Sequence, residues 1–163
     1  KKKDDFEFFK YCTAMSLLSG QQLGWCKADV IYSEKHIEFL KKYVDVRYKY
    51  TKLFNSARML RPAKVTTDKP VMTTTAGLSS DGIIECEQVL SGAWKYRNGS
   101  KTVIFASSIA EDDVNYTLTF NAREYGIIDK KLPEGFVLDG DMCTVTGKLG
   151  RFDTAVWEFE LEV

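Results

Sequence analysis

Few residues of this 163-residue chain have the types and spacing that chemistry requires. The single histidine, His36, has no cysteine or second histidine at a ligand spacing, and the four cysteines form no C-x-x-C pair. We therefore expect no metal site and no cofactor. His36 is expected at the surface or as a capping residue. The cysteines are expected to be buried free thiols, with Cys86–Cys143 as the best pairing if a disulfide forms.

Asp29 is the acidic residue best placed for catalysis, because it lies just past Trp25 in a segment that suits a loop beside a cleft. Glycoside hydrolysis needs two carboxylates held across a cleft, and no second acid is singled out by its surroundings. A small enzyme that uses Asp29, or the strand that carries Glu85 and Glu87, is therefore a rival interpretation.

Trp25 is the tryptophan best placed to contact a ligand. It lies in an irregular segment between Gly24 and Cys26, where its ring could stack on a sugar or pack between a helix and a sheet. Trp94 and Trp157 follow the inward phase of predicted strands, so we expect both in the core.

The composition excludes two classes of function. Hydrophobic residues make up 44% and charged residues 28% of the chain, as in ordinary globular domains. The net charge is zero, which argues against a nucleic-acid binder. No apolar run reaches the roughly 18–20 residues that a membrane span needs, and the first residues do not suit a signal peptide.

Charge and glycine divide the chain near Pro62. Residues 1–62 carry 13 basic and 7 acidic side chains, whereas residues 63–163 carry 10 and 16. Two glycines precede Pro62 and nine follow it. We therefore predict two domains, a helical segment over 1–62 and an antiparallel β-sandwich over 63–163, in an α+β fold. The opposite net charges suit surfaces that attract one another or are simply solvated differently.

The first part predicts two helices. One apolar stripe recurs at three- and four-residue steps along the first helix: Phe8, Cys12, Met15 and Leu18. Gly20 would end that helix, and Ser33 is the expected N-cap of a second one that runs to about Phe54. The second helix has a broad aromatic face: Ile37, Leu40, Tyr43, Val44, Arg47, Tyr48 and Tyr50. Two such helices cannot enclose a core alone, so another layer must cover them.

The second part predicts about eight short antiparallel strands in two stacked sheets. Residues 114–120 and 155–163 alternate apolar and polar side chains, as half-buried strands do. Asn98-Gly99 is the strongest hairpin signal, because both residues accept positive φ values in a tight turn. Strands are also expected at 83–90 and 143–149, with an edge strand near 70–75.

Four segments, in sequence order, carry a resemblance to a known family. They are Ser-Gly-Gln-Gln-Leu-Gly-Trp at 19–25, the helix at 37–54, Arg-Met-Leu-Arg-Pro at 58–62, and Leu-Ser-Gly-Ala-Trp-Lys at 90–95 with the hairpin that follows. In order, they resemble the last strand of a barrel, its last helix, the exit from the barrel and the start of a sandwich. The chain resembles the C-terminal part of a TIM-barrel glycoside-hydrolase-like protein of the gut-bacterial type.

The resemblance implies part of a carbohydrate-active protein. A barrel needs about 200 or more residues, so the remainder of a TIM barrel would be a partner of this chain. The family's catalytic carboxylates would lie on earlier strands, and no catalytic residue is carried over. The implied ligand contacts are Gln22 and Trp25, at the carboxyl end of the last barrel strand, and Asp29 lies near them. A secreted or periplasmic location is implied by the resemblance only.

We therefore expect a non-catalytic C-terminal region of a carbohydrate-active enzyme, with a structural or accessory role. The alternative is a stand-alone β-sandwich module that binds carbohydrate or protein, which predicts an exposed aromatic platform. A glycan is a candidate partner, whereas nucleic acid and membrane are not expected. If the apolar faces of the helices were left uncovered, they would favour self-association.

Overall fold

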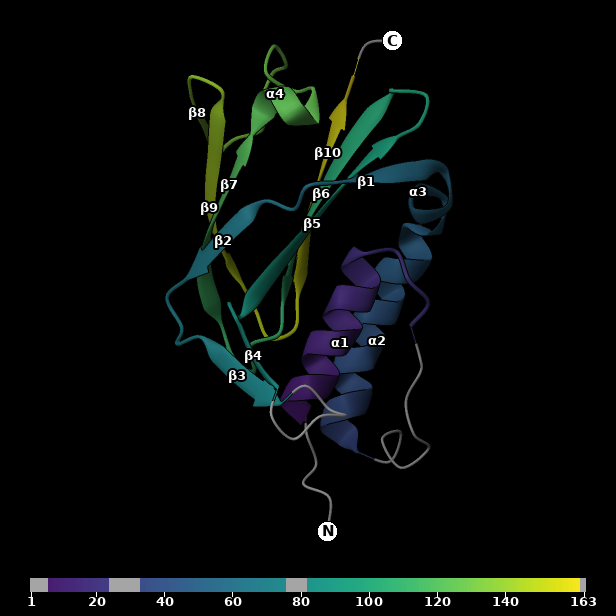
Figure 1. Cartoon of the computed structure of the whole chain (residues 1–163), viewed down its shortest axis with the longest axis vertical. Helices are drawn as coiled ribbons and strands as arrows, with labels where there is room; N and C mark the ends of the chain where they lie inside the picture. The colour runs from purple at the N-terminus through teal and green to yellow at the C-terminus, as the bar shows by residue number, and fades with distance from the viewer. Residues whose placement is uncertain (1–5, 24–32, 76–81, 162–163) are drawn as a thin grey trace.

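The computed structural model of this chain describes residues 6–23, 33–75 and 82–161. Within them the chain builds three layers, namely a helical layer and two antiparallel sheets stacked face to face (Figure 1). The predicted α+β fold with a β-sandwich is confirmed. The described residues form ten strands, more than expected, because the four-residue strands at Ala57–Leu60 and Lys64–Thr67 are too short for their alternation to stand out.

Sheet A is the middle layer, with the strand order β1-β5-β6-β10. Its antiparallel strands are β1 (Ala57–Leu60), β5 (Val89–Tyr96), β6 (Lys101–Ser108) and β10 (Thr154–Glu160). The predicted turn at Asn98-Gly99 joins β5 to β6. Gly99 has a φ of +78°, and the Asn98 side chain accepts a hydrogen bond from the Ser100 amide at 3.1 Å.

Sheet B is the outer β layer, with the strand order β2-β7-β9-β8. Its antiparallel strands are β2 (Lys64–Thr67), β7 (Val114–Asn121), β9 (Met142–Leu149) and β8 (Phe136–Asp139). A short helix, α4 (Ala122–Tyr125), follows β7, and a separate two-stranded ribbon pairs β3 (Met72–Thr75) with β4 (Ile83–Cys86). The strands predicted at 114–120 and 143–149 are therefore confirmed as β7 and β9.

The two sheets enclose one of the two cores of the molecule. Ile104 from sheet A and Leu118 from sheet B are fully buried in it, and the rings of Phe120 and Tyr125 stack at 4.7 Å. Trp157 is half-buried at the edge of this core, where its ring meets the Phe136 ring edge-on at 5.5 Å. The predicted inward orientation of Trp157 is confirmed.

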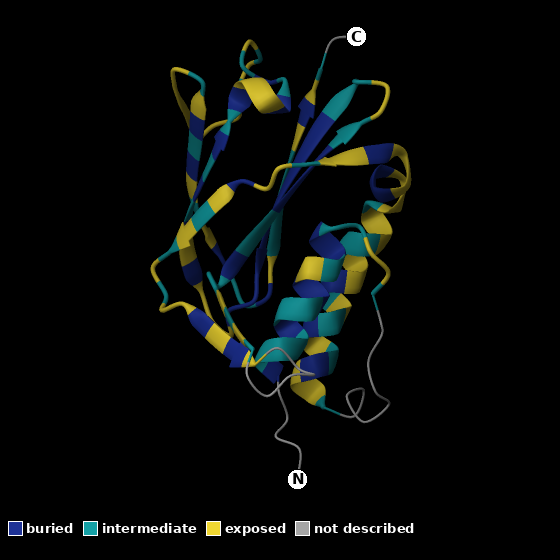
Figure 2. Cartoon of the chain, in the orientation of Figure 1, coloured by how far each residue is buried: buried dark blue, intermediate teal, exposed yellow. Residues whose placement is uncertain are grey.

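The helical layer covers the other face of sheet A and forms the second core. Its helices are α1 (Phe6–Leu18), α2 (Glu34–Lys49) and α3 (Thr51–Ser56). Leu17 and Phe39 are fully buried beneath them, and the Tyr43 hydroxyl donates a 2.9 Å hydrogen bond to the Ser108 carbonyl. The Trp94 indole, buried as predicted, donates to the Leu18 carbonyl at 2.9 Å. Figure 2 shows exposed residues along α2 and buried stretches in β5 and β6, which lie beside the helices.

The apolar stripe predicted for the first helix is right only for Leu18 and is otherwise wrong. The buried residues of α1 are Phe6, Lys10, Thr13, Ala14, Leu17 and Leu18, whereas Met15 is 40% exposed and Phe8 and Cys12 are half-buried. The difference arises because α1 contacts α2, β3 and β5, so the buried face is wider than one stripe and admits the aliphatic stem of Lys10.

The second helix and the exit from it also differ from the prediction. Ser33 is the N-cap residue of α2, but its side chain makes no capping hydrogen bond, and the helix breaks at Tyr50 before α3 begins. The segment after α3 is a strand: β1 pairs with β5, with Leu60 opposite Ala93. One strand of the sandwich therefore precedes Pro62, the predicted boundary between the two parts.

Candidate functional site

The residues that the sequence singled out as a site are not brought together in the described structure. Gln22 is exposed just beyond the end of α1, and Trp25 and Asp29 lie outside the described residues. Glu85 is exposed on β4, whereas the Glu87 carboxylate accepts hydrogen bonds from the Thr67 hydroxyl at 2.7 Å and the Thr67 amide at 3.2 Å. Glu87 therefore holds β2 next to the segment that follows β4.

His36 and the cysteines do not form a reactive centre. His36 is only 2% exposed and its ring packs on Phe6 and Phe9 at 4.6 and 4.8 Å, so the expected surface or capping role is wrong. Cys86 and Cys143 are free thiols: Cys143 is fully buried in the core between the sheets, whereas Cys86 is half-buried against the core beneath the helices. Burial, and then the negative charges of nearby carboxylates, raise the pKa of Cys86 to about 11, so this thiol stays protonated near neutral pH.

The described part of the chain shows neither a metal-binding cluster nor a membrane-spanning helix. No group of three or more histidine, cysteine or acidic side chains in it is placed to hold a metal ion. None of its helices is both long and apolar enough to pass through a bilayer.

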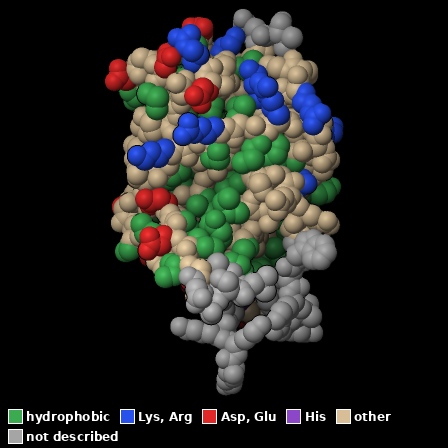
Figure 3. Space-filling model, viewed as in Figure 1, with side chains coloured by type: hydrophobic (Ala, Val, Ile, Leu, Met, Phe, Trp, Pro, Cys, Tyr) green, Lys and Arg blue, Asp and Glu red, His purple; other side chains and the backbone are tan. Residues whose placement is uncertain are grey.

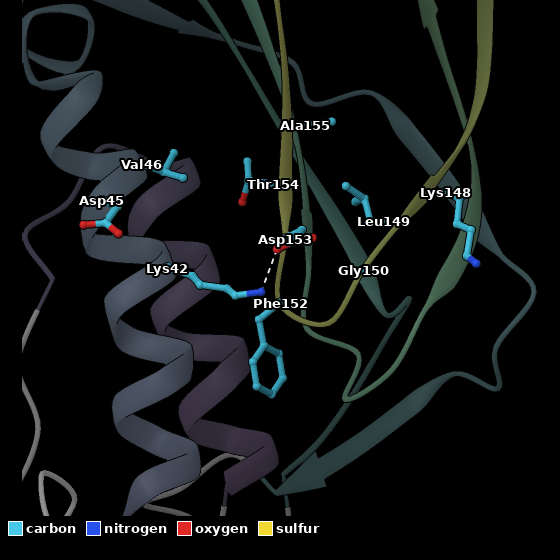
Figure 4. A pocket seen from close by; sticks show the side chains of 10 residues that line it. All are labelled: Lys42, Asp45, Val46, Lys148, Leu149, Gly150, Phe152, Asp153, Thr154 and Ala155. Carbon is cyan, nitrogen blue, oxygen red and sulfur yellow. Dashed lines mark hydrogen bonds and ion pairs between the residues drawn. The ribbon is translucent and has the colours of Figure 1, made fainter.

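A cleft of about 430 Å³ lies between α2 and the turn that joins β9 to β10 (Figure 4). Lys42 reaches across it from α2 and donates hydrogen bonds to the Arg151 carbonyl at 2.6 Å and to the Asp153 carboxylate at 2.7 Å. Thr154 shares a hydrogen bond with Ser107 at 3.0 Å. These polar groups already bind one another. The bonds from Lys42 therefore join the helical layer to the sandwich across the cleft.

Phe152 anchors the same turn. It has a φ of +59° although it is not glycine, a conformation that costs about 1–2 kcal/mol. Its ring is fully buried and meets the Phe39 ring edge-on at 5.0 Å. The burial of a phenylalanine side chain contributes about 1.5–3 kcal/mol, which offsets that cost. The unusual backbone at this turn therefore has a packing explanation.

A second hollow, which we call the threonine groove, lies on the outer face of sheet B and has a volume of about 640 Å³. It is lined by Thr66, Thr67, Asp68, Asn115, Tyr116, Thr117, Thr146, Gly147 and Lys148. The antiparallel register places Thr66 opposite Thr117 and Thr117 opposite Thr146. Alternation along each strand turns all three side chains outward, so a row of hydroxyl groups crosses β2, β7 and β9.

The charged side chains of the threonine groove are already paired. Asp68 accepts hydrogen bonds from the Asn115 side-chain amide at 2.6 Å and from the Asn115 backbone amide at 2.9 Å, and these bonds hold the pKa of its carboxyl below the usual value. Lys148 binds Asp113 at 2.6 Å, which raises the pKa of Lys148. The middle of the groove therefore offers neutral hydroxyl groups, which both donate and accept hydrogen bonds.

Tyr116 and Gly147 belong to the floor of the groove, and the Tyr116 side chain points from it into the core between the sheets. The two residues are opposite one another in β7 and β9, and a Cβ atom at position 147 would lie 2.6 Å from the Tyr116 hydroxyl. Only glycine allows that approach. Tyr116 is nearly buried, and burial raises the pKa of its phenol, so the hydroxyl remains a neutral hydrogen-bonding group. A glycine within an alternating strand is the one sequence signal that indicates this contact.

Comparison of the chain with protein-family models, curated proteins and solved structures finds no match.

Proposed function

We propose that this chain is a non-catalytic accessory module of a carbohydrate-active protein, and that it binds a glycan in the threonine groove. The observation that carries the proposal is the row of outward hydroxyl groups formed by Thr66, Thr117 and Thr146. Sugars present dense arrays of hydroxyl groups. A surface that donates and accepts hydrogen bonds at regular strand spacing is complementary to them.

The acidic residues near the groove support a binding role rather than catalysis. Asp68 is the only carboxylate among the described residues that line the groove, whereas glycoside hydrolysis needs two carboxylates across a cleft. Asp68 is also held by two hydrogen bonds from Asn115. These observations support a module that binds without cleaving.

The packing of the helices on sheet A supports an accessory module. It does not suit helices that complete a barrel. The apolar faces of α1 and α2 pack on sheet A of the same chain, with Leu17, Phe39 and Tyr43 fully buried. Large apolar side chains that remain exposed on these two helices are scattered: Met15, Val44 and Tyr48. A role as the last helices of a barrel would need a broad apolar face on the opposite side.

The mode of sugar binding that we propose differs from the aromatic platform expected for a stand-alone module. The outward residues of β7 in sheet B are polar, namely Asn115, Thr117, Thr119 and Asn121. Recognition would therefore depend on hydrogen bonds. Because each such bond contributes only about 0.5–1.5 kcal/mol net, the affinity is expected to be weak for short oligosaccharides and higher for polymers.

Titration calorimetry with a panel of neutral and acidic oligosaccharides tests the proposal. The double variant Thr117→Val/Thr146→Val removes two hydroxyl groups from the groove and keeps the side-chain shape. Thr73→Val/Thr75→Val is the matched control, because it makes the same two changes at exposed threonines of β3 that do not line the groove. We expect the groove variant to lose at least about tenfold in affinity and the control to bind like the parent. Absence of binding to every glycan, or equal binding by both variants, would refute the proposal.

A further inference from the structure

We propose that the glycan bound by this module is acidic, a uronate or sulfate polymer, and that a basic strip beside the threonine groove recognises its charge. This inference rests on the proposed function. The basic strip is made of Arg58, Arg61, Lys64, Lys95 and Arg97. Arg58 and Arg61 lie on and just after β1, Lys64 begins β2, and Lys95 and Arg97 lie at the end of β5.

Like charges face one another within this strip. Arg58 is directly opposite Lys95 in the antiparallel pair of β1 and β5, an arrangement that destabilises a sheet. None of the five basic side chains forms an ion pair with a described residue, whereas Lys101 and Arg123 elsewhere do bind carboxylates. A fold that keeps repelling charges together, without neutralising them, points to an anion that is supplied from outside.

The basic strip leads directly to the groove. Lys64 and Thr66 are both exposed and lie two residues apart on β2, so their side chains point to the same outer face. The six residue steps from Arg58 to Lys64 span at most about 20 Å of extended chain. Basic side chains spread over β1 and β2 in the upper half of the face seen in Figure 3. A polymer bound in the groove can therefore continue along the strip.

Protection of the sheet edges does not fully explain these charges. Charged side chains on edge strands discourage pairing with other chains, and this accounts for Arg58 on β1 and Lys64 on β2. Lys95, however, lies on β5, an inner strand between β1 and β6. It lies opposite Arg58, and its ammonium group packs beside Gly126 at the end of α4, where a Cβ atom would be 2.8 Å from it, so its charge does not guard an edge.

An acidic glycan fits the strip better than a nucleic acid does. Proteins that bind single strands present aromatic side chains on which bases stack. The strongly exposed aromatic side chain among the described residues, Tyr48, lies on α2 and is not part of the strip. The hydroxyl groups of Thr66 and Thr117 instead lie where the strip ends.

Binding to three polymers tests the inference: polygalacturonate, neutral dextran and single-stranded DNA. The strip variant is Arg58→Gln/Lys95→Gln, and Lys41→Gln/Lys131→Gln is the control, because it removes the same charge from exposed residues outside the strip. We expect polygalacturonate to bind most tightly and to weaken with salt. The strip variant should lose about fivefold per charge removed, and the control less than twofold.

Different results would refute the acidic ligand and the proposed function. Equal binding of dextran and polygalacturonate, with no effect of the strip variant, would overturn the inference and leave the proposed function intact. Tighter binding of single-stranded DNA than of polygalacturonate would overturn it in favour of a nucleic-acid ligand. If neither the parent protein nor the groove variant Thr117→Val/Thr146→Val binds any polysaccharide, the proposed function itself is refuted. Thermal unfolding of the strip variant checks that its fold is retained.

Discussion

At the scale of single residues, the threonine groove depends on the close approach of Tyr116 to Gly147. The Tyr116 phenol fills the space that a side chain at 147 would take, and its ring lies 6.4 Å from that of Trp157 inside the sandwich. The Tyr116 side chain therefore packs in the core directly beneath the strands that form the floor of the groove. The shape of the groove is therefore coupled to the packing between the sheets.

Gly147→Ala is expected to destabilise the protein by about 1–3 kcal/mol, because the new methyl group overlaps the Tyr116 hydroxyl. Urea unfolding measures this loss. In the Tyr116→Phe background the same substitution should cost less, since the nearest atom is gone. Thr146→Ala, an exposed neighbour on β9, is the control and should change the stability by less than about 0.5 kcal/mol. An alanine at 147 that leaves stability unchanged would refute the contact.

The charge cluster around Glu158 predicts how stability depends on pH. A 2.7 Å hydrogen bond from Lys101, and a 3.0 Å bond from the Tyr50 hydroxyl, hold the pKa of the Glu158 carboxyl below its usual value. As pH falls, the unfolded chain takes up this proton before the folded one does. The stabilisation is therefore present above the unfolded pKa of about 4.3, and is lost as pH falls through the folded pKa.

Glu158→Gln should be less stable than the parent at neutral pH and should lose less of its stability when the pH is lowered from 7 to 3. The urea midpoint, measured across that range, reports the difference. Glu134→Gln, at an exposed residue outside the sheets, serves as the control and should follow the parent curve. Parallel curves for the parent and Glu158→Gln would contradict the assigned role of this carboxylate.

At the scale of elements, β1 is the strand whose sequence fits its place least well. It is an edge strand of four residues, and it places Arg58 directly opposite Lys95. Its neighbour β5 is long and largely buried. The pairing of β1 with β5 therefore persists in spite of repulsion between side chains on one face.

Arg58→Glu converts that repulsion into attraction and should stabilise the protein by about 0.5–1 kcal/mol. Thermal unfolding at low salt should show a higher midpoint, and the gain should shrink as salt screens the charges. Arg58→Gln removes the repulsion without adding an attraction and should fall between the parent and Arg58→Glu. An unchanged or lower midpoint for Arg58→Glu would contradict the repulsion between Arg58 and Lys95.

How far the sequence predicts an element depends on how local its signal is. The alternation over residues 114–120 predicts β7, and Asn98-Gly99 predicts the β5–β6 turn, because both signals lie within a few residues. The buried face of α1 was mispredicted, since its neighbours come from distant parts of the chain. The groove could not be predicted either: alternation indicates that Thr117 faces outward, but only the strand register places it beside Thr66 and Thr146.

At the scale of the whole molecule, the opposite charges of the two parts of the chain meet where the helices pack on the sandwich. Lys10 of α1 binds Glu111 at 3.3 Å, and Lys42 of α2 binds Asp153 at 2.7 Å. These pairs neutralise some of the basic residues of the first part. Arg58 and Arg61 of the first part have no such partner among the described residues. With Lys64, Lys95 and Arg97 of the second part they form the basic strip, beside a groove on the opposite side of the sandwich from the helices (Figure 1).

The most direct test of the central claim is a map of backbone amide shifts in ¹⁵N spectra while polygalacturonate oligomers are added. We expect the largest shift changes at residues 64–68, 115–117 and 146–148, which form the groove and the end of the strip. Changes that concentrate on Lys42 and Asp153 of the cleft beside α2, or that appear nowhere, would contradict the claim that the groove binds a glycan.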